Sequence, residues 1–394
     1  MNIEWKIPMN SFKVPRIRFK RFDSVWVENR IADIVKISAG GDVDKVRLKE
    51  SGKYPVIANA LTNKGIVGFY DDYKVKAPAV TVTGRGDVGY AVARHENFTP
   101  VVRLLTLQSE NIDVDYLENQ INSMRILNES TGVPQLTAPQ LGNYKVYHPE
   151  IEEQSAIGSL FRTLDDLLAS YKDNLANYQS FKVAMLAKMF PKAGQTVPEI
   201  RLDGFEGEWE EKYIGELADI VRGASPRPIQ DPKWFDLNSE IGWLRISDVT
   251  NQNGRIHSLE QKISKLGQEK TRVLTEPHLL LSIAATVGKP VVNYVKTGVH
   301  DGFLIFMNPK FDREFMFQWL EIFREKWNRY GQPGSQVNLN SDIVKNQKIL
   351  VPCMEEQQAI GTYFSILDNL INSHQEKISQ LETLKKKLLQ DMFI

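Results

Sequence analysis

The sequence predicts an α+β protein in which two globular domains alternate with two long helices that pack on each other as a coiled coil. Three observations support this class. Two segments recur in both halves of the 394-residue chain, which marks an internal repeat. A seven-residue apolar pattern closes each copy. Short β-branched runs separated by turn residues fill the middle of each copy.

The repeat is clearest at the two ends of each copy. Residues 14–26 and 197–209 share six of thirteen residues at an offset of 183, including a Val-Pro-x-Ile-Arg run and a closing tryptophan. Residues 152–167 and 355–370 share ten of sixteen residues at an offset of 203. Because the offset grows by 20 residues, the extra length lies in the middle of the second copy. Alike ends and unlike middles indicate a fixed frame that carries two differently specialised modules.

The segments that close each copy are expected to be helices of about 35–40 residues, or about 50–60 Å. Apolar or aromatic residues recur at every seventh position, which is the spacing of a coiled-coil seam. Pro149 and Pro191 bracket the first helix and Pro352 precedes the second, as expected at helix boundaries. We interpret the polar His374 on the seam as a packed residue that sets register. The seam residues are Ile157, Leu164, Tyr171, Tyr178, Ile360, Leu367, His374 and Leu381.

The repeat divides the chain into four parts. These are a first globular domain over residues 1–150, a first helix with its linker over 151–196, a second domain over 197–350 and a second helix over 351–394. Within the domains, β-branched runs bounded by Gly, Asn and Asp predict strands. The runs are 54–59, 65–70, 79–83, 90–93 and 101–107 in the first domain, and 242–247, 279–283, 291–295 and 303–306 in the second. An amphipathic helix is expected over 314–330, with a counterpart over 113–128.

Composition limits the classes of function. The chain has 49 basic and 49 acidic residues and a net charge of zero, which argues against a free-standing protein that holds nucleic acid by bulk electrostatics. The single cysteine, Cys353, excludes a disulfide framework and a cysteine-based zinc site. No run approaches the length of a membrane span, and no basic segment followed by an apolar stretch opens the chain. A cytoplasmic protein is therefore expected.

Residues 84–89, Gly-Arg-Gly-Asp-Val-Gly, match the G-x-G-x-x-G pattern of dinucleotide sites. Such a site needs a helix that opens at the third glycine. Residues 90–93 instead predict a strand, and the matching residues 284–288 keep only the last glycine. We therefore favour a tight turn between two strands over a nucleotide-dependent enzyme. The backbone amides of this turn and Arg85 are placed to approach a phosphate or a base edge.

Other motifs of catalysis are missing from the sequence. The chain has no P-loop and no amino-methyltransferase tetrapeptide, and its six histidines never fall at metal-ligand spacing. We therefore predict no catalytic residue, no metal site and no cofactor. Two basic segments leave two interpretations open. Residues 222–228, Arg-Gly-Ala-Ser-Pro-Arg-Pro, form either a DNA-contacting loop or a plain surface turn, and residues 13–21 either follow a nucleic-acid backbone or are simply solvated.

These features resemble the specificity subunits of type I restriction-modification enzymes, from about Val14 to Phe393. The resemblance rests on the two Glu-Glu-Gln-x-Ala-Ile-Gly segments, the two Val-Pro-x-Ile-Arg segments, Gly223–Pro226 and the Val-Gly turns at 88–89 and 287–288. It implies two target-recognition domains that each read one half of a bipartite DNA site. It also implies that the helices form an antiparallel coiled coil with pseudo-twofold symmetry, set the spacing of the half-sites and dock two methyltransferase subunits. Motor-nuclease subunits would complete the enzyme, and the specificity subunit itself would not be catalytic.

The expected function is therefore recognition of double-stranded DNA without catalysis, and unlike modules predict an asymmetric target. The alternative is a coiled-coil scaffold without DNA specificity of its own. In the first copy, residues 38–42 (Ser-Ala-Gly-Gly-Asp) replace the Gly-Ala-Ser-Pro loop, so the role of that loop is not carried over. The candidate DNA-contacting residues are Arg85, Gly86, Arg222, Ser225, Arg227, Arg245 and Lys289.

Overall fold

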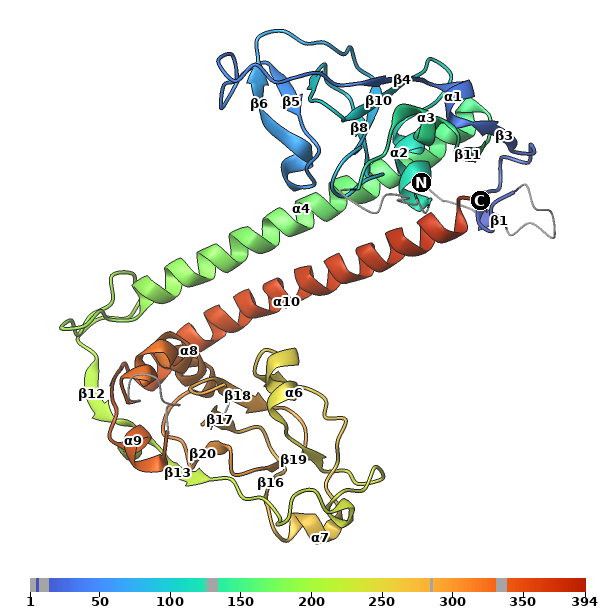
Figure 1. Cartoon of the computed structure of the whole chain (residues 1–394). Helices are drawn as coiled ribbons and strands as arrows, with labels where there is room; N and C mark the ends of the chain where they lie inside the picture. The colour runs from blue at the N-terminus through green and yellow to red at the C-terminus, as the bar shows by residue number, and fades with distance from the viewer. Residues whose placement is uncertain (1–4, 7–13, 125, 127–133, 284–285, 331–338) are drawn as a thin grey trace. The chain divides into compact units, whose positions relative to one another are not determined.

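The computed structural model describes residues 5–6, 14–124, 126, 134–283, 286–330 and 339–394. The chain forms two compact units, and each long helix contributes to both. The first unit contains Met1–Asp173 and His374–Ile394, and the second contains Asn174–Ser373. The long helices are α4 (Ile151–Met189) and α10 (Met354–Asp391), with 39 and 38 residues (Figure 1). The predicted helix lengths are thus confirmed.

A four-stranded antiparallel arrangement is common to the two globular domains. In the first domain the order is β4 (Lys36–Ala39), β10 (Leu105–Gln108), β7 (Ala79–Val82) and β8 (Ala91–Arg94). In the second it is β13 (Asp219–Arg222), β20 (Phe303–Met307), β17 (Leu279–Ser282) and β18 (Pro290–Asn293). The helices α2 (Val114–Ser123) and α8 (Arg313–Phe323) pack on these sheets. Strands β7 and β17 are buried along their whole length, as expected from their continuous apolar runs.

A second sheet distinguishes the two domains. In the first domain β5 (Tyr54–Ile57) pairs parallel with β9 (Thr99–Pro100) and antiparallel with β6 (Ile66–Tyr70). In the second, β19 (Thr297–Val299) pairs parallel with β14 (Gly242–Trp243) and antiparallel with β16 (Arg272–Leu274). Both domains therefore contain the parallel pair. The third strand joins the earlier strand of the pair, β5, in the first domain and the later strand, β19, in the second. The second domain also contains β15 (Arg255–Ile256), α6 (Ile246–Asn251) and α7 (Lys265–Gln268) in its middle.

Short elements complete the frame of each domain. Strand β3 (Val27–Arg30) pairs with β11 (Lys145–His148), and β12 (Glu210–Tyr213) pairs with β21 (Lys348–Val351). Each pair brings the start of a domain to the strand that precedes its long helix. The remaining elements are β1 (Trp5–Lys6), β2 (Arg18–Phe19), α1 (Ile31–Ile34), η1 (Thr62–Gly65), α3 (Ala138–Gly142), α5 (Ile214–Leu217), η2 (Pro232–Trp234), η3 (Arg324–Tyr330) and α9 (Ser341–Lys345).

A buried ion pair joins the first repeated segment to the second. In the second unit, Arg201 donates from Nε and Nη2 to the two carboxylate oxygens of Glu356, at 2.8 and 2.7 Å. The Glu356 side chain is only 1 % exposed. The equivalent pair in the first unit is Arg18 with Glu153, with both distances 2.6 Å. Two parallel charged hydrogen bonds are among the strongest side-chain contacts, so this fork fixes each helix start to its domain.

The other residues of the repeated Glu-Glu-Gln-x-Ala-Ile-Gly segments pack the start of each long helix on the neighbouring helix. The Gln357 amide accepts from Asp312 N and donates to Pro352 O, both at 3.0 Å. Asp312 in turn caps α8 by accepting from Phe315 N at 2.9 Å. A Cβ at Gly361 would lie 2.4 Å from the Asp312 carboxylate, so only glycine allows this approach. The same contacts in the first unit join Gln154, Asp113, Pro149, Tyr116 and Gly158.

Within each unit the two long helices run antiparallel, which confirms the expected arrangement. Lys385 pairs with Asp165 at 2.5 Å in the first unit, and Lys182 pairs with Asp368 at 2.5 Å in the second. The two pairs are equivalent at the offset of 203. The seam residues Ile157, Leu164, Ile360, Leu367 and Leu381 are buried, Tyr178 packs against the core of the second unit, and the rings of Tyr171 and His374 lie 5.3 Å apart.

Several predicted elements end earlier than expected. The strand predicted over 242–247 stops at Trp243, because Arg245 caps α6. The strand predicted over 101–107 begins at Leu105, because Arg103 has a left-handed φ of 69°. The helix predicted over 113–128 ends at Ser123, and the one over 314–330 continues beyond Phe323 as the 3₁₀ segment η3. Residues 13, 127–128 and 284–285 lie outside the described residues.

The Arg201–Glu356 fork is expected to contribute strongly to stability. Replacing Glu356 with Gln leaves Arg201 without its charged partner, which we expect to lower the free energy of unfolding by roughly 3 kcal/mol. Urea unfolding of the purified chain measures this change. Glu355→Gln, at the exposed neighbouring position, is the matched control and should cost less than about 0.5 kcal/mol. Equal effects of the two substitutions would show that the fork does not anchor the helix.

Candidate nucleic-acid interface

The loop after β13 crosses the segment between β19 and β20. Gly223 N donates to Phe303 O at 2.9 Å, and Ala224 N donates to Val299 O at 3.0 Å. A Cβ at Gly223 would lie 2.1 Å from His300 O, so this crossing requires a glycine. The crossing brings the predicted loop 222–228 beside Asp301.

Three of the predicted residues in this loop make hydrogen bonds to Asp301. Arg222 Nε donates to the backbone oxygen of Asp301 at 2.7 Å. Ser225 Oγ donates to Asp301 Oδ1 at 2.8 Å, and Arg227 Nη2 donates to Asp301 Oδ2 at 2.5 Å. Partial burial opposes ionisation of Asp301, but the Ser225 hydroxyl and the Arg227 charge outweigh it, so the pKa of the carboxyl lies below its ordinary value. The Arg227 side chain remains 71 % exposed. The loop therefore presents an open guanidinium beside a charged carboxylate.

A shallow pocket of about 260 Å³ adjoins this cluster. Arg245 lines it and donates to Asp248 at 3.1 and 2.8 Å, and this contact raises the pKa of the guanidinium despite its partial burial. Trp243 and His300 form part of the wall, with ring centroids 5.9 Å apart. The structure thus brings Arg222, Ser225, Arg227 and Arg245 together. Sequence reasoning missed Trp243, His300 and Asp301, because only the β14–β19 pairing and the crossing bring them together.

Lys289, the remaining candidate in the second domain, lies in another place. Its Nζ contacts Glu321 Oε1 at 2.5 Å and Asn253 Oδ1 at 2.9 Å. The Lys289 side chain is only 13 % exposed. It lines a different hollow, with Lys182 of α4 and Glu321 of α8. The structure does not bring Lys289 to the Asp301 cluster.

In the first domain, Arg85 and Gly86 lie in the turn between β7 and β8. Thr83 N donates to Tyr90 O, and strand β8, not a helix, follows the third glycine. The predicted tight turn is therefore confirmed. Arg85 is exposed, and Gly86 has a φ of 80° with open space around it.

Polar residues from three other segments gather at this turn. Arg85 forms a backbone bridge with Gln135, and the Arg103 guanidinium donates to the Gln135 side chain at 3.0 Å. The Asn59 side chain accepts from Gly84 N at 2.8 Å and donates to Val102 O at 3.1 Å. Asn59, Arg103 and Gln135 were not predicted. Arg103 carried the only signal, as an arginine near a turn, but its left-handed backbone was not foreseeable.

The two domains share the backbone crossing but differ in side chains. In the first domain Gly40 N donates to Leu104 O at 2.9 Å, and a Cβ at Gly40 would lie 2.1 Å from Val101 O. These contacts match those of Gly223, so residues 38–42 occupy the place of the second-domain loop. The position equivalent to Asp301 is Val102, which is 44 % exposed.

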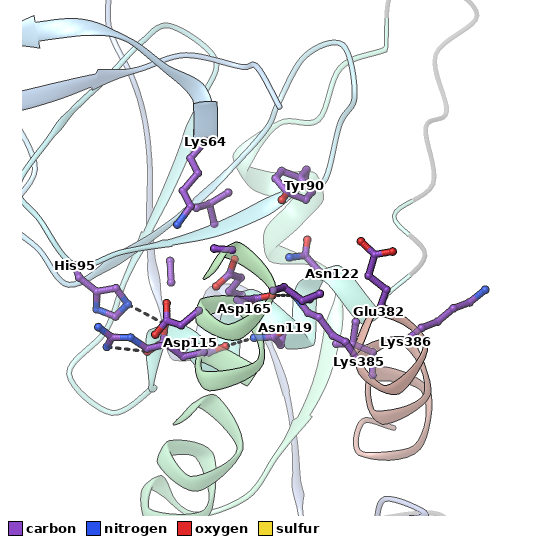
Figure 2. A pocket seen from close by; sticks show the side chains of 18 of the residues that line it. Lys64, Tyr90, His95, Asp115, Asn119, Asn122, Asp165, Glu382, Lys385 and Lys386 are labelled. Carbon is purple, nitrogen blue, oxygen red and sulfur yellow. Dashed lines mark hydrogen bonds and ion pairs between the residues drawn. The ribbon is translucent and has the colours of Figure 1, made fainter. Parts of the chain in front are cut away.

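A larger hollow of about 830 Å³ lies within the first unit, between the first domain and the long helices (Figure 2). Lys64 and Tyr90 lie on its domain side, and Lys385 and Lys386 lie on α10. On the side of the hollow formed by the first domain, His95 Nε2 lies 2.8 Å from Asp115 Oδ1. The lining mixes acids and bases, so it carries no single sign of charge.

Glu118 of α2 lines this hollow, and the pKa of its carboxyl group is unusually high. Burial and repulsion by Asp165 raise its pKa to about 7, against the opposing effects of Ala93 N–H and Lys385. In the unfolded chain the ordinary value is 4.5. Between these pH values the folded protein holds a proton that the unfolded chain has lost, so the free energy of unfolding falls as the pH rises.

Glu118→Gln should remove this dependence, because glutamine resembles the protonated acid. We expect the variant to match the parent near pH 4.5 and to exceed it at pH 8 by at most roughly 3 kcal/mol. Urea unfolding between pH 4.5 and pH 8 measures the difference. Glu110→Gln removes an exposed carboxyl and should keep the parent's slope. A Glu118 variant with the parent's slope would contradict the assignment.

The part of the chain that the structure describes has neither a membrane-spanning helix nor a metal-binding cluster. No described helix is both long and apolar enough to cross a membrane. Among the same residues, no three His, Cys, Asp or Glu side chains are grouped so that they could hold a metal ion.

The fold and the two loop clusters define a protein of two unlike domains on a repeated helical frame. The chain belongs to the family of the type I restriction modification DNA specificity domain. The model of this family matches the chain twice, over residues 23–177 and 206–383. The two matches follow the internal repeat.

Two relatives agree with this membership, and a solved structure shares the fold. A putative type I specificity subunit of Mycoplasma pneumoniae, S.MpnORF507P, is 26 % identical over 91 % of this chain and 94 % of its own length. The MjaVIII specificity subunit of Methanocaldococcus jannaschii is 23 % identical over 66 % of this chain, which spans only 64 % of that relative. A crystal structure of the type I S subunit from M. genitalium has the same fold, with a TM-score of 0.69, 15 % identity, and coverage of 97 % of this chain and 99 % of that one.

Proposed function

We propose that this chain is the non-catalytic DNA-specificity subunit of a type I restriction-modification enzyme. Residues 1–150 and 197–350 are the two target-recognition domains, and each reads one half of a bipartite, asymmetric site in double-stranded DNA. Residues 151–196 and 351–394 supply the helices that set the spacing. The observation that carries the proposal is the shared backbone crossing with different side chains beside it, the exposed Val102 in one domain and the partly exposed Asp301 in the other, in a chain of the DNA specificity family.

The candidate DNA contacts suit this role chemically. They place guanidinium groups and small residues on loops or at the ends of elements, since Arg222 ends β13 and Arg245 is the N-cap of α6. The candidates are Arg85 and Gly86 in the first domain, and Arg222, Ser225, Arg227 and Arg245 in the second. Guanidinium groups bind phosphates and guanine edges in a bidentate manner. Lys289 is paired with Glu321 and only 13 % exposed, whereas Arg227 is 71 % exposed, so the loss of Lys289 should cost less affinity than the loss of Arg227.

The partners in this proposal are two methyltransferase subunits and, beyond them, motor-nuclease subunits in the cytoplasm. The helices expose apolar side chains at equivalent positions, which supports docking of two copies of one partner. The two equivalent pairs are Leu167 and Leu370, 42 and 40 % exposed, and Phe181 and Leu384, 49 and 45 % exposed. The methyltransferase subunits would carry the chemistry and much of the positive charge that phosphates require. With a net charge of zero, this chain alone should bind DNA weakly at physiological salt.

Exchange of one domain tests the two-module proposal. Replacing residues 14–150 with the corresponding domain of another family member should change one half-site and leave the other unaltered. Methylation mapping of DNA modified by the assembled complex measures both halves. A change in both half-sites would overturn the proposal, and assembly with a methyltransferase without any sequence preference would favour a scaffold.

Arg227→Ala should weaken DNA binding by the assembled complex about 5- to 150-fold, which corresponds to roughly 1–3 kcal/mol for a base contact. A fluorescence binding titration at fixed salt measures the loss. Lys348→Ala is the matched control, because it also removes one exposed positive charge and one ion-pair partner from the second domain, outside the pocket. Unchanged affinity of the Arg227 variant would remove this residue from the interface.

A further inference from the structure

We propose that Asp301 reads a base: its carboxylate accepts a hydrogen bond from the exocyclic amino group of a cytosine or an adenine in the half-site of the second domain. The inference rests on the proposed function and assigns a specificity-determining residue within it. Three contacts to the segment 222–227 hold this residue, and Asp301 lines the same pocket as Arg245.

The position of Asp301 is fixed although its side chain is partly open. The residue follows β19 in a turn in which Phe303 N donates to His300 O at 3.2 Å and Gly302 N donates to His300 Nδ1 at 2.9 Å. Asp301 N also donates to Ser225 Oγ at 3.2 Å. The side chain is nevertheless 35 % exposed. A rigid backbone with a partly exposed acceptor suits recognition, because little conformational freedom is lost when a base binds.

The charge of Asp301 argues for a base rather than a phosphate as its ligand. An ionised carboxylate is an acceptor only, and phosphates repel it. In the major groove, the amino groups of cytosine and adenine are the donors that such an acceptor can bind. The neighbouring Arg227 offsets the repulsion, and its 71 % exposed guanidinium keeps donors besides the Nη2 contact to Asp301 for the DNA backbone or an adjacent guanine. Together the two side chains offer one acceptor and several donors side by side.

The internal repeat supplies an independent comparison. The crossing of Gly40 over Val101 has the same hydrogen bonds and the same close approach as the crossing of Gly223 over His300. At the next position the first domain has Val102 and the second has Asp301. A constant backbone with a partly exposed acid in one copy and an exposed apolar residue in the other is expected of a position that sets specificity. A residue needed only for the fold would keep its chemistry in both copies.

A purely positioning role for Asp301 makes a different prediction. If Asp301 only oriented Arg227, its replacement would weaken binding to all sequences alike. If Asp301 contacts a base, the preference at one position of one half-site changes. Base preference therefore separates the two roles, whereas affinity alone does not.

The experiment uses the chain assembled with its methyltransferase subunits and a library of DNA sites randomised in both halves. For Asp301→Asn, we expect a preference for cytosine at one position of the second-domain half-site to fall at least tenfold, whereas a preference for adenine would be kept, because an asparagine amide also binds adenine. The other half-site should be unchanged. Asp236→Asn, at an exposed acid of the same domain, is the matched control and should leave both halves unaltered.

Asp301→Val, which copies the residue of the first domain, provides a second variant and should lose the same preference. An unchanged preference in this variant would overturn the proposal whatever the asparagine variant does, and so would a uniform loss over all sequences. Ser225→Ala keeps the carboxylate and should reduce affinity without changing the preferred base. A parent complex without any sequence preference would refute the proposed function itself, which distinguishes that failure from failure of this inference.

Discussion

The buried fork between Arg201 and Glu356, with its equivalent between Arg18 and Glu153, is the contact on which the frame of this protein depends. It joins the first repeated segment of each copy to the second, although more than 130 residues separate them in sequence. Around the fork, the Gln357 side chain accepts a hydrogen bond from Asp312, the N-cap residue of the neighbouring helix, and Gly361 permits the close approach of the two helices. The alike residues of the repeat are therefore those that make this joint. Between the repeated segments the joint contacts the helix caps at Asp113 and Asp312, whereas the loop clusters of the two domains take no part in it and are free to differ.

The frame could be predicted from sequence because its signals are local or repeated. Heptad spacing and flanking prolines gave the two long helices, and the growth of the offset located the extra residues of the second copy. Continuous apolar runs located β7, β17 and β20 well. Strands such as β4 and β13 were missed because they are short and partly exposed, without a periodic pattern. Arg245 lies at a helix cap rather than in a strand, because its hydrogen bonds to Asp248 outweigh the β propensity of its neighbours.

The candidate site could be predicted only by residue type. Arginine and glycine in loops gave Arg85, Arg222 and Arg227, but nothing in the sequence placed Asp301 beside them. That contact depends on the passage of one strand end over another, 74 to 79 residues away. Lys289 illustrates the opposite error of prediction by residue type. A lysine suits DNA binding, but this one is held in an ion pair with Glu321. Local patterns identify the chemistry available, whereas long-range topology decides which groups meet.

The reciprocal contacts of the long helices have a further consequence. Asp165 pairs with Lys385, and Lys182 pairs with Asp368, so each copy offers its counterpart the same acid and the same base. An isologous interface of this kind is what a symmetric homodimer uses. Two separate copies of one repeat would necessarily carry identical modules. Covalent fusion of the copies removes that restriction, because each half can then diverge while the interface remains self-complementary. A symmetric means of association thereby holds two unlike domains in a fixed one-to-one ratio.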